Sequence, residues 1–252
     1  MKNIIKKLYF ILPVFLLVVG CQSKNTVEEI NISAAASLKE VMGEIKTEYE
    51  IKNKNINLTI NYGSSGSLKQ QIEQGAPCDI FISAGQSQVE QLDKGGFLVS
   101  DTVKEFTRNK LALIAPKDVS LKNIDDLTTD KIKHIGVGYP DSVPAGKYAD
   151  EVLNSLNLKE KVKDKLTFGK DVKEVLAWTS SGNADAGFVY ISDTVNNNSV
   201  KVVEVIDEKN HSPIIYPIAI TKSSKKYEQS KKLEEFLLSE DVKKILNKYG
   251  YN

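Results

Sequence analysis

Alternation of strand-like and helix-like segments constrains the fold of this chain more than any other feature. Residues 56–62 alternate in hydrophobicity as a strand does, and residues 38–49 place apolar side chains at three- and four-residue spacing, as one helix face does. Similar segments follow one another from residue 30 to the C-terminus. This order predicts an α/β fold of mostly parallel sheets flanked by helices.

Small or capping residues stand at four of the expected strand-to-helix junctions. Ser37, Ser67 and Asp171 each precede a Glu or Gln by three residues, which predicts a capping box at each, and Pro144 suits the first position of a further helix. A helix that begins directly after a strand presents unpaired amides and the positive end of its dipole at one place. One such junction alone indicates only a structural cap, but four together predict an anion site.

The four junctions divide evenly along the chain, because two precede Arg108 and two follow it. About 230 residues follow the N-terminal segment, which is more than one average domain contains. Ligands of α/β sheets bind beyond the carboxyl ends of the strands. We therefore expect two lobes, each with a mostly parallel sheet flanked by helices, that aim two helix starts apiece into one cleft.

The first 20 residues are expected to be a signal peptide rather than part of the fold. Lysines at positions 2, 6 and 7 precede an apolar run at residues 8–19, which is too short to span a bilayer comfortably. Gly20-Cys21 follows and resembles a bacterial lipobox, in which the cysteine is lipidated and becomes the mature N-terminus. The alternatives are a signal anchor, or a secretory signal with an incidental cysteine. Residues 21–28 are polar, so we expect a tether between the lipid and a fold that begins at residue 29.

Composition limits what this domain can bind. The chain has 34 basic and 33 acidic side chains, so it lacks the basic excess typical of nucleic-acid binding. Removing the three lysines of the signal peptide leaves 31 basic and 33 acidic side chains, a net charge of −2. An exported, nearly neutral domain on one lipid anchor at the cell membrane is expected. Arg108 is the only arginine, so the chain offers at most one guanidinium fork for a carboxylate or phosphate, and we expect Arg108 to be a structural or surface residue.

Cysteine and histidine are too few for a disulfide framework or a metal centre. Cys21 and Cys78 are the only cysteines, and a lipid on Cys21 leaves Cys78 without a disulfide partner. Cys78 is best explained as a small buried apolar residue. His134 and His211 are the only histidines, and no Cys/His cluster accompanies them, so no metal site is expected.

Five segments, in this order, resemble the molybdate-binding protein of the bacterial molybdate ABC importer. They are AAASL at 34–38, GSSGSL at 63–68, GAPCDIFISA at 75–84, VPAG at 143–146 and GFVY at 187–190. The resemblance extends from about residue 30 to the C-terminus. Cys78 departs from the family, which more often has a small aliphatic residue there, and this departure concerns packing rather than the ligand.

The resemblance implies a two-lobed fold of the periplasmic-binding-protein type with two crossover strands. It places the first lobe at 29–107 with 217–252 and the second at 108–216, with hinges near 108–112 and 214–219. It also implies that ligand oxygens are bound by the side chains of Ser37 and Ser65, the amides of Ala145 and Val172, and the hydroxyl of Tyr190. Such a protein is a monomer that has no cofactor, catalyses no reaction and delivers molybdate or tungstate to an ABC permease.

The chemistry of these oxyanions fits a site made only of hydrogen-bond donors. Molybdate and tungstate carry no proton at neutral pH, whereas phosphate is partly protonated and would also need an acceptor. Sulfate is smaller, so a rigid cleft of the larger size would leave donors out of its reach. One alternative is a site for another tetrahedral oxyanion such as sulfate.

A second alternative, from a different class, is an exported serine hydrolase with Ser37 or Ser65 as nucleophile. Such an enzyme needs a histidine base oriented by an acid. Neither serine lies in a Gly-x-Ser-x-Gly turn of the kind that presents a hydrolase nucleophile. The sequence therefore favours a binding protein over an enzyme.

Overall fold

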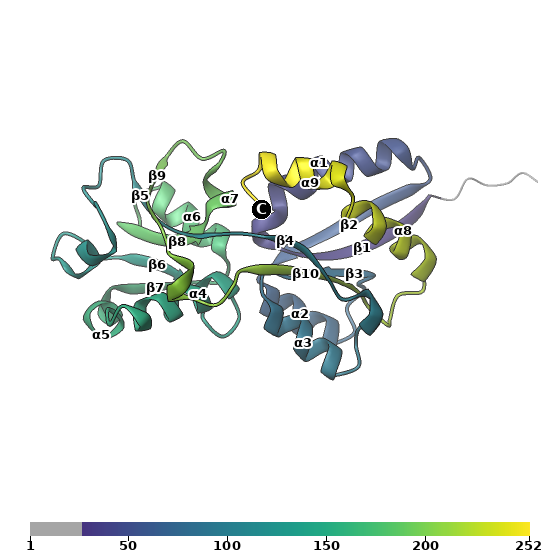
Figure 1. Cartoon of the computed structure of the whole chain (residues 1–252), viewed down its shortest axis with the longest axis horizontal. Helices are drawn as coiled ribbons and strands as arrows, with labels where there is room; N and C mark the ends of the chain where they lie inside the picture. The colour runs from purple at the N-terminus through teal and green to yellow at the C-terminus, as the bar shows by residue number, and fades with distance from the viewer. Residues whose placement is uncertain (1–26) are drawn as a thin grey trace, which may run out of the picture.

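Two lobes, each built around a five-stranded sheet, make up the computed structural model, which describes residues 27–252 (Figure 1). The predicted signal peptide at 1–20 and the predicted lipidation site Cys21 lie outside the described residues. The first strand begins at Glu28, so the last residue of the predicted tether belongs to the fold. No helix within residues 27–252 is both long and apolar enough to cross a bilayer.

The first lobe contains a sheet with the strand order β2-β1-β3-β10-β4. Its strands are β1 (Glu28–Ala35), β2 (Ile56–Gly63), β3 (Ile80–Ile82), β4 (Lys104–Arg108) and β10 (Ile215–Ile220). Its helices are α1 (Lys39–Lys52), α2 (Ser65–Glu73), α3 (Gln86–Lys94), α8 (Tyr227–Leu237) and α9 (Glu240–Lys248). Four strands point one way and β10 runs against them. Helices α1 and α9 cover one face of the sheet, and α2 and α3 cover the other (Figure 1).

The second lobe repeats this plan with the strand order β7-β6-β8-β5-β9. Its strands are β5 (Leu111–Pro116), β6 (Ile135–Gly138), β7 (Leu166–Gly169), β8 (Ala186–Tyr190) and β9 (Val200–Val205). Its helices are α4 (Pro144–Ser155), α5 (Lys159–Val162), α6 (Val172–Ser180) and α7 (Ile191–Thr194). Only β5 runs against the other four strands. Strands β5, β6 and β8 are buried along their whole length, because helices or neighbouring strands cover both faces.

The chain passes between the lobes at two places. Residues 109–110 connect β4 of the first sheet to β5 of the second, and residues 206–214 connect β9 back to β10. The two crossings are joined by a hydrogen bond from the Asn109 amide to the Ile214 carbonyl, 3.1 Å long. The second crossing lies mostly before the predicted range 214–219, because residues 215–220 pair with β3 and β4 of the first sheet. Strand β10 also starts two residues before the predicted lobe boundary at 217.

Two of the predicted N-caps are wrong. Ser37 lies inside a short 3₁₀ helix, Ala36–Leu38, and helix α1 after it has no side-chain cap. The Ser37 hydroxyl instead contacts Tyr216 of β10, with 2.9 Å between the oxygens. Helix α2 is capped by Ser64 rather than Ser67, since Ser64 Oγ accepts from the Ser67 amide at 3.3 Å.

The other two helix starts are confirmed. Asp171 is the N-cap of α6, and its carboxylate accepts from the Glu174 amide at 2.9 Å. The Glu174 carboxylate accepts from the Lys170 amide at 2.7 Å rather than from the Asp171 amide. The reciprocal bond of the capping box is therefore made by the residue before the N-cap. Pro144 opens α4, as its fixed φ and missing amide hydrogen predict.

Candidate functional site

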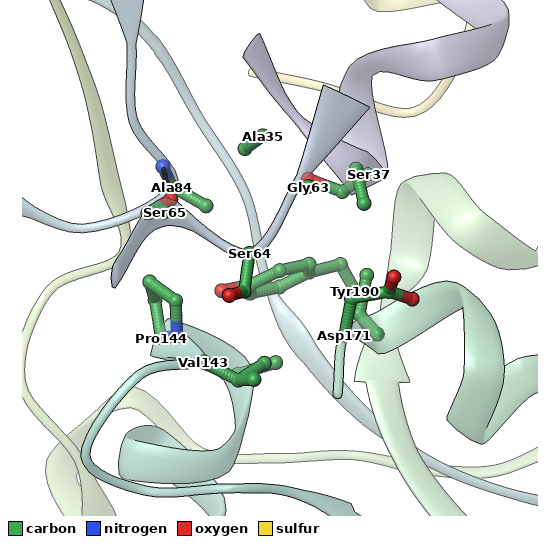
Figure 2. Close-up of a pocket in the computed structure, with 13 residues that line it drawn as sticks. Ala35, Ser37, Gly63, Ser64, Ser65, Ala84, Val143, Pro144, Asp171 and Tyr190 are labelled. Atoms are coloured by element: carbon green, nitrogen blue, oxygen red, sulfur yellow. Dashed lines mark hydrogen bonds between the residues drawn. The ribbon is translucent and has the colours of Figure 1, made fainter. Parts of the chain in front are cut away.

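A cavity lies between the two lobes at the ends of the strands (Figure 2). It has a volume of about 210 Å³, including its mouth. The lining residues are Ala35, Ala36, Ser37, Gly63, Ser64, Ser65 and Ala84 from the first lobe, and Val143, Pro144, Ala145, Asp171, Val172 and Tyr190 from the second. All five residues predicted to bind the ligand are therefore brought to one cavity.

The first lobe contributes two buried serine hydroxyls. Ser65 is the first residue of α2, and its Oγ accepts a hydrogen bond from the Ala84 amide at 2.9 Å. Because the Ala84 amide supplies that hydrogen, the Ser65 hydroxyl keeps its own hydrogen to donate. Ser37 is 3% exposed, and Tyr251 near the C-terminus holds its carbonyl by a 2.9 Å hydrogen bond.

The second lobe contributes two helix N-termini. Ala145 is the second residue of α4 and Val172 is the first of α6, so neither amide has an acceptor within its helix. Both helices direct the positive ends of their dipoles at the cavity. Helix α4 can start this close to β6 because Gly146 has no side chain: a Cβ there would lie 2.1 Å from the Gly138 carbonyl oxygen.

Tyr190, the last residue of β8, adds a neutral donor to this side. Its ring extends into the space between the labelled residues (Figure 2), and the side chain is 1% exposed. The hydroxyl has no hydrogen-bond partner among residues 27–252. Burial raises the pKa of Tyr190 well above 10, so the phenol remains protonated. A buried, unpaired O–H group is costly unless a ligand accepts from it.

Charge at the site comes from helix ends rather than from basic side chains. Among the described residues, no lysine or arginine lines the cavity, and the Asp171 carboxylate there is used to cap α6. Lys173, the residue after Val172, has its ammonium 2.8 Å from Asp193 and 2.6 Å from Glu40 of the first lobe. Burial alone would lower the pKa of Lys173, but the carboxylates of Asp193 and Glu40 outweigh burial, and the net pKa is raised.

The lobes touch each other around the cavity. The Gly66 amide on α2 donates to the Ser142 carbonyl of the second lobe at 2.9 Å. The Lys173–Glu40 ion pair makes a second contact between the lobes. The structure therefore has the arrangement in which both lobes can contact one small ligand at the same time.

The cavity does not have the groups of a serine hydrolase. No histidine of the described chain lines it. His211 packs against Tyr148, with 5.9 Å between ring centroids, and His134 lies at the start of β6 away from the lining residues. Ser37 and Ser65 thus have no base to activate them. Within residues 27–252, no three His, Cys, Asp or Glu residues lie close enough to hold a metal ion.

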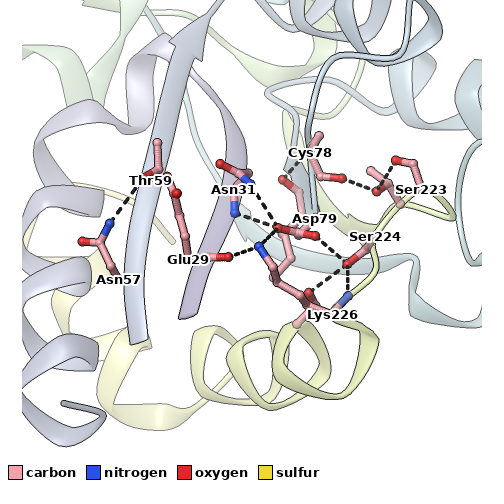
Figure 3. A network of polar contacts seen from close by, with 12 residues as sticks. Glu29, Asn31, Asn57, Thr59, Cys78, Asp79, Ser223, Ser224 and Lys226 are labelled. Atoms are coloured by element: carbon pink, nitrogen blue, oxygen red, sulfur yellow. Dashed lines mark hydrogen bonds and ion pairs between the residues drawn. The ribbon is translucent and has the colours of Figure 1, made fainter. Parts of the chain in front are cut away.

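Asp79 and Cys78, from the 75–84 segment, lie at the other end of the first sheet (Figure 3). The Asp79 carboxylate accepts from the Asn31 amide at 2.8 Å and from the Ser224 hydroxyl at 2.6 Å. These bonds fasten the segment before α8 to β1. Cys78 is buried, as predicted, and burial raises the pKa of its thiol to about 11. Arg108 is exposed and pairs with Glu105 at 2.7 Å, as expected of a surface residue.

Several residues around the site were missed by sequence reasoning. Ser64 and Ala84 lie within the motifs but were given no role there. Lys173 directly follows Val172, one of the predicted ligand residues, so its position in the sequence could have indicated that it lies near the site. Asn109 and Tyr216 lie in or beside the crossings between the lobes, and no local pattern marks them.

Comparisons with known proteins agree with this arrangement. Residues 30–252 match the family described as bacterial extracellular solute-binding protein. The chain is 38% identical over 248 residues to YvgL of Bacillus subtilis, assigned as an ABC transporter substrate-binding lipoprotein, with 95% of each chain covered. It is 34% identical over 229 residues to the molybdate-binding protein ModA of Haemophilus influenzae, covering 89% of this chain and 90% of that one.

A solved structure gives a closer match in sequence. It is assigned as the substrate-binding domain of a molybdenum ABC transporter from Clostridium difficile, and it is 63% identical to this chain. The match covers 89% of this chain and 98% of that one, with a TM-score of 0.70.

Proposed function

The chain belongs to the bacterial extracellular solute-binding proteins, which bind solutes rather than catalyse reactions, and from this premise we propose that it captures molybdate between its lobes. One observation carries the proposal: the candidate ligand groups are donors, namely two serine hydroxyls, two helix-start amides and the unpaired Tyr190 hydroxyl. A dianion without a proton can accept from all of them. The Asp171 carboxylate also lines the cavity, and it accepts from the Glu174 amide at the start of its own helix.

The names of the relatives support the choice of molybdate among oxyanions. The ModA protein of H. influenzae is a molybdate-binding protein, and the C. difficile domain is assigned to a molybdenum transporter. We extend the proposal to tungstate, because the two oxyanions have nearly equal size and the same charge. Sulfate is smaller and would leave part of the donor set beyond hydrogen-bond distance.

Delivery to an ABC importer follows from the same relationships. YvgL and the C. difficile domain are both assigned to ABC transporters, so we propose a permease of that class as the partner. We further propose that the protein works as a monomer whose lobes close about the crossings at 109–110 and 206–214, by the hinge motion known for periplasmic binding proteins. YvgL is assigned as a lipoprotein, which supports lipidation of Cys21 and attachment to the outer face of the cell membrane.

Thermal unfolding of the domain from residue 27 onward, with each oxyanion in turn, tests the proposal. A ligand present at 100 times its Kd stabilises a protein by about 2.7 kcal/mol, which shifts Tm by roughly 5–10 °C for a domain of this size. Molybdate and tungstate should produce this shift, and sulfate and phosphate should not. An equal shift with sulfate would support the alternative of a general tetrahedral-oxyanion site. No shift with any of the four would refute the proposed function.

A matched variant ties the binding to this cavity. Ser65→Ala removes one donor and leaves the Ala84 amide without its acceptor, so molybdate should bind about 10- to 100-fold more weakly. Ser67→Ala, two residues further along the same helix, removes a hydroxyl that does not line the cavity; its oxygen accepts from Ser64 Oγ at 2.8 Å, but Ser64 is not among the proposed ligand groups, so the affinity should change little. Equal effects of the two changes would place the ligand elsewhere.

A further inference from the structure

We propose that Asn109 and Tyr216 form a hydrogen-bond relay that fixes the Ser37 hydroxyl as a donor and thereby selects oxyanions that carry no proton. Neither residue lines the cavity, so both would act through Ser37 as positioning residues. This inference rests on the proposed function, since it assigns the protonation state of the ligand that the same cavity prefers.

The orientation of the Asn109 side chain is fixed by its neighbour. The Lys110 amide donates to Asn109 Oδ1 at 2.9 Å, so the side-chain NH₂ group must face the other way. There Nδ2 lies 2.8 Å from Ser192 Oγ of the second lobe and 3.3 Å from the Tyr216 hydroxyl oxygen. An amide NH₂ group can only donate. The Tyr216 oxygen therefore accepts from Asn109.

Tyr216 passes this direction on to Ser37. The only other hydrogen bond that its hydroxyl makes among the described residues is to Ser37 Oγ, 2.9 Å away. The Tyr216 oxygen already accepts from Asn109, and Ser37 Oγ is its other hydrogen-bond partner among residues 27–252, so we assign the Tyr216 hydrogen to Ser37. The ring packs edge-on between Tyr190 and Tyr251, with 5.7 Å to each ring centroid, so the hydroxyl is held in place. Burial raises the pKa of Tyr216 well above 10, so the phenol keeps the hydrogen that it donates.

Ser37 is left with its own hydrogen for the cavity. Its Oγ accepts from Tyr216 just as Ser65 Oγ accepts from the Ala84 amide. The two serines are thus oriented alike, although one is fixed by a backbone amide and the other by a side-chain relay. Asn109, Tyr216 and Ser37 are all buried, so water does not compete for these bonds.

The relay discriminates by protonation rather than by size. Molybdate can accept from every proposed donor, whereas hydrogen phosphate brings a hydrogen of its own into a site whose proposed ligand groups are all donors. The one carboxylate among the lining residues, that of Asp171, caps α6 through one oxygen. The phosphate hydrogen either loses its partner or displaces a donor, and a buried unpaired donor is costly. The relay therefore supplies a structural reason for excluding phosphate by its proton, independent of the dimensions of the cavity.

Asn109→Asp tests the relay because it reverses the direction of the hydrogen bonds, while the side chain at position 109 keeps almost the same shape. The carboxylate can only accept, so Tyr216 would donate to Asp at position 109 and accept from Ser37, whose lone pairs would then face the cavity. We would measure Kd for molybdate and for phosphate by calorimetry at mildly alkaline pH, where molybdate and hydrogen phosphate both carry two negative charges. The new carboxylate then repels both ligands alike. The ratio of the two Kd values therefore measures only the effect of the proton that hydrogen phosphate carries.

The preference for molybdate over phosphate should fall about 10- to 100-fold in Asn109→Asp, corresponding to one hydrogen bond to a charged group. An unchanged ratio overturns the relay while leaving the proposed function intact, whereas failure of the wild-type protein to bind molybdate refutes the proposed function itself. Where phosphate binding is too weak to measure, a double-mutant cycle that combines Asn109→Asp with Ser37→Ala tests whether Asn109 acts through Ser37. Asn109→Asp should then weaken molybdate binding at least tenfold less in the Ser37→Ala background, and equal effects in both backgrounds overturn the relay.

A second variant keeps the test valid if Asn109→Asp does not fold. Tyr216→Phe keeps the ring and removes the hydroxyl, so Ser37 can rotate but is not forced to accept. Molybdate binding should weaken about 2- to 10-fold, as expected for the loss of one neutral hydrogen bond. Wild-type affinity in this variant would show that Ser37 needs no relay.

Discussion

Replacing Gly66 by alanine is expected to hold the two lobes apart. Gly66 is the second residue of α2, and its amide donates to the Ser142 carbonyl of the other lobe at 2.9 Å. A Cβ at this position would lie 2.6 Å from the Ser142 oxygen and 2.7 Å from its Cα. Ordinary contact needs about 3.4 Å, and backbone atoms on both sides cannot rotate out of the way. The lobes would therefore have to separate by roughly 0.8 Å here.

That separation would act on the donors of the second lobe. A hydrogen bond of about 2.9 Å stretched by this amount exceeds 3.5 Å and contributes little. Losing two charge-assisted hydrogen bonds costs about 3–6 kcal/mol, which corresponds to at least about a 100-fold weaker Kd. The fold of each lobe should be unaffected, because alanine is the better helix former by about 0.5–1 kcal/mol. Gly66→Ala should thus change the Tm without ligand little, since the lost Gly66–Ser142 hydrogen bond offsets the gain in helix propensity, and it should abolish most of the shift that molybdate causes.

Gly43→Ala in α1 is the matched control. A Cβ at Gly43 meets no atom within 4 Å, so this variant makes the same chemical change without a clash between the lobes. It should raise the Tm without ligand and keep the full molybdate shift. Calorimetry of both variants gives the two Kd values directly. Wild-type affinity in Gly66→Ala would refute the idea that the lobes must close to this distance when ligand binds.

Three further predictions concern the ion pair, the unpaired phenol and the buried tyrosines. Glu40→Gln removes a half-exposed contact of Lys173 between the lobes, so molybdate should bind about 1.5- to 5-fold more weakly at low salt, and this difference should vanish at high salt; a salt-independent difference in calorimetry would contradict an electrostatic role. Tyr190→Phe removes a buried hydroxyl that has no partner among residues 27–252, so Tm without ligand should stay equal or rise while molybdate affinity drops about 10- to 100-fold; a loss of Tm would indicate a structural partner. Burial raises the pKa of Tyr190, Tyr216 and Tyr251 in the folded protein. Above about pH 10 these tyrosines ionise in the unfolded chain but not in the folded protein. Their contribution to stability is therefore complete below pH 10 and is lost as pH rises further. Tm should therefore fall steeply above about pH 10, and a Tm that stays constant through about pH 11 would contradict this explanation.

Local sequence determined the elements of this protein and the places where a ligand could meet them. The apolar runs of β5, β6 and β8 predict buried strands because both faces of each strand are covered, and Pro144 and Asp171 mark helix starts because their effects reach only a few residues. The five candidate ligand residues were named through the resemblance to a known family, but all of them lie at junctions that the residues themselves had indicated or at the end of a strand. Periodicity and capping are short-range properties, so one sequence is enough to show them.

Tertiary structure alone decided what those junctions do. Ser37 has the spacing of an N-cap, yet its hydroxyl contacts Tyr216, 179 residues away, and Asn109 from the crossing between the lobes lies 3.3 Å from the same Tyr216 hydroxyl. Gly66 reads as a loop glycine, and only the approach of Ser142 from the other lobe shows why a side chain is excluded there. These contacts depend on how two sheets are placed relative to each other. No pattern within a few residues encodes that placement, because it results from the packing of the whole chain.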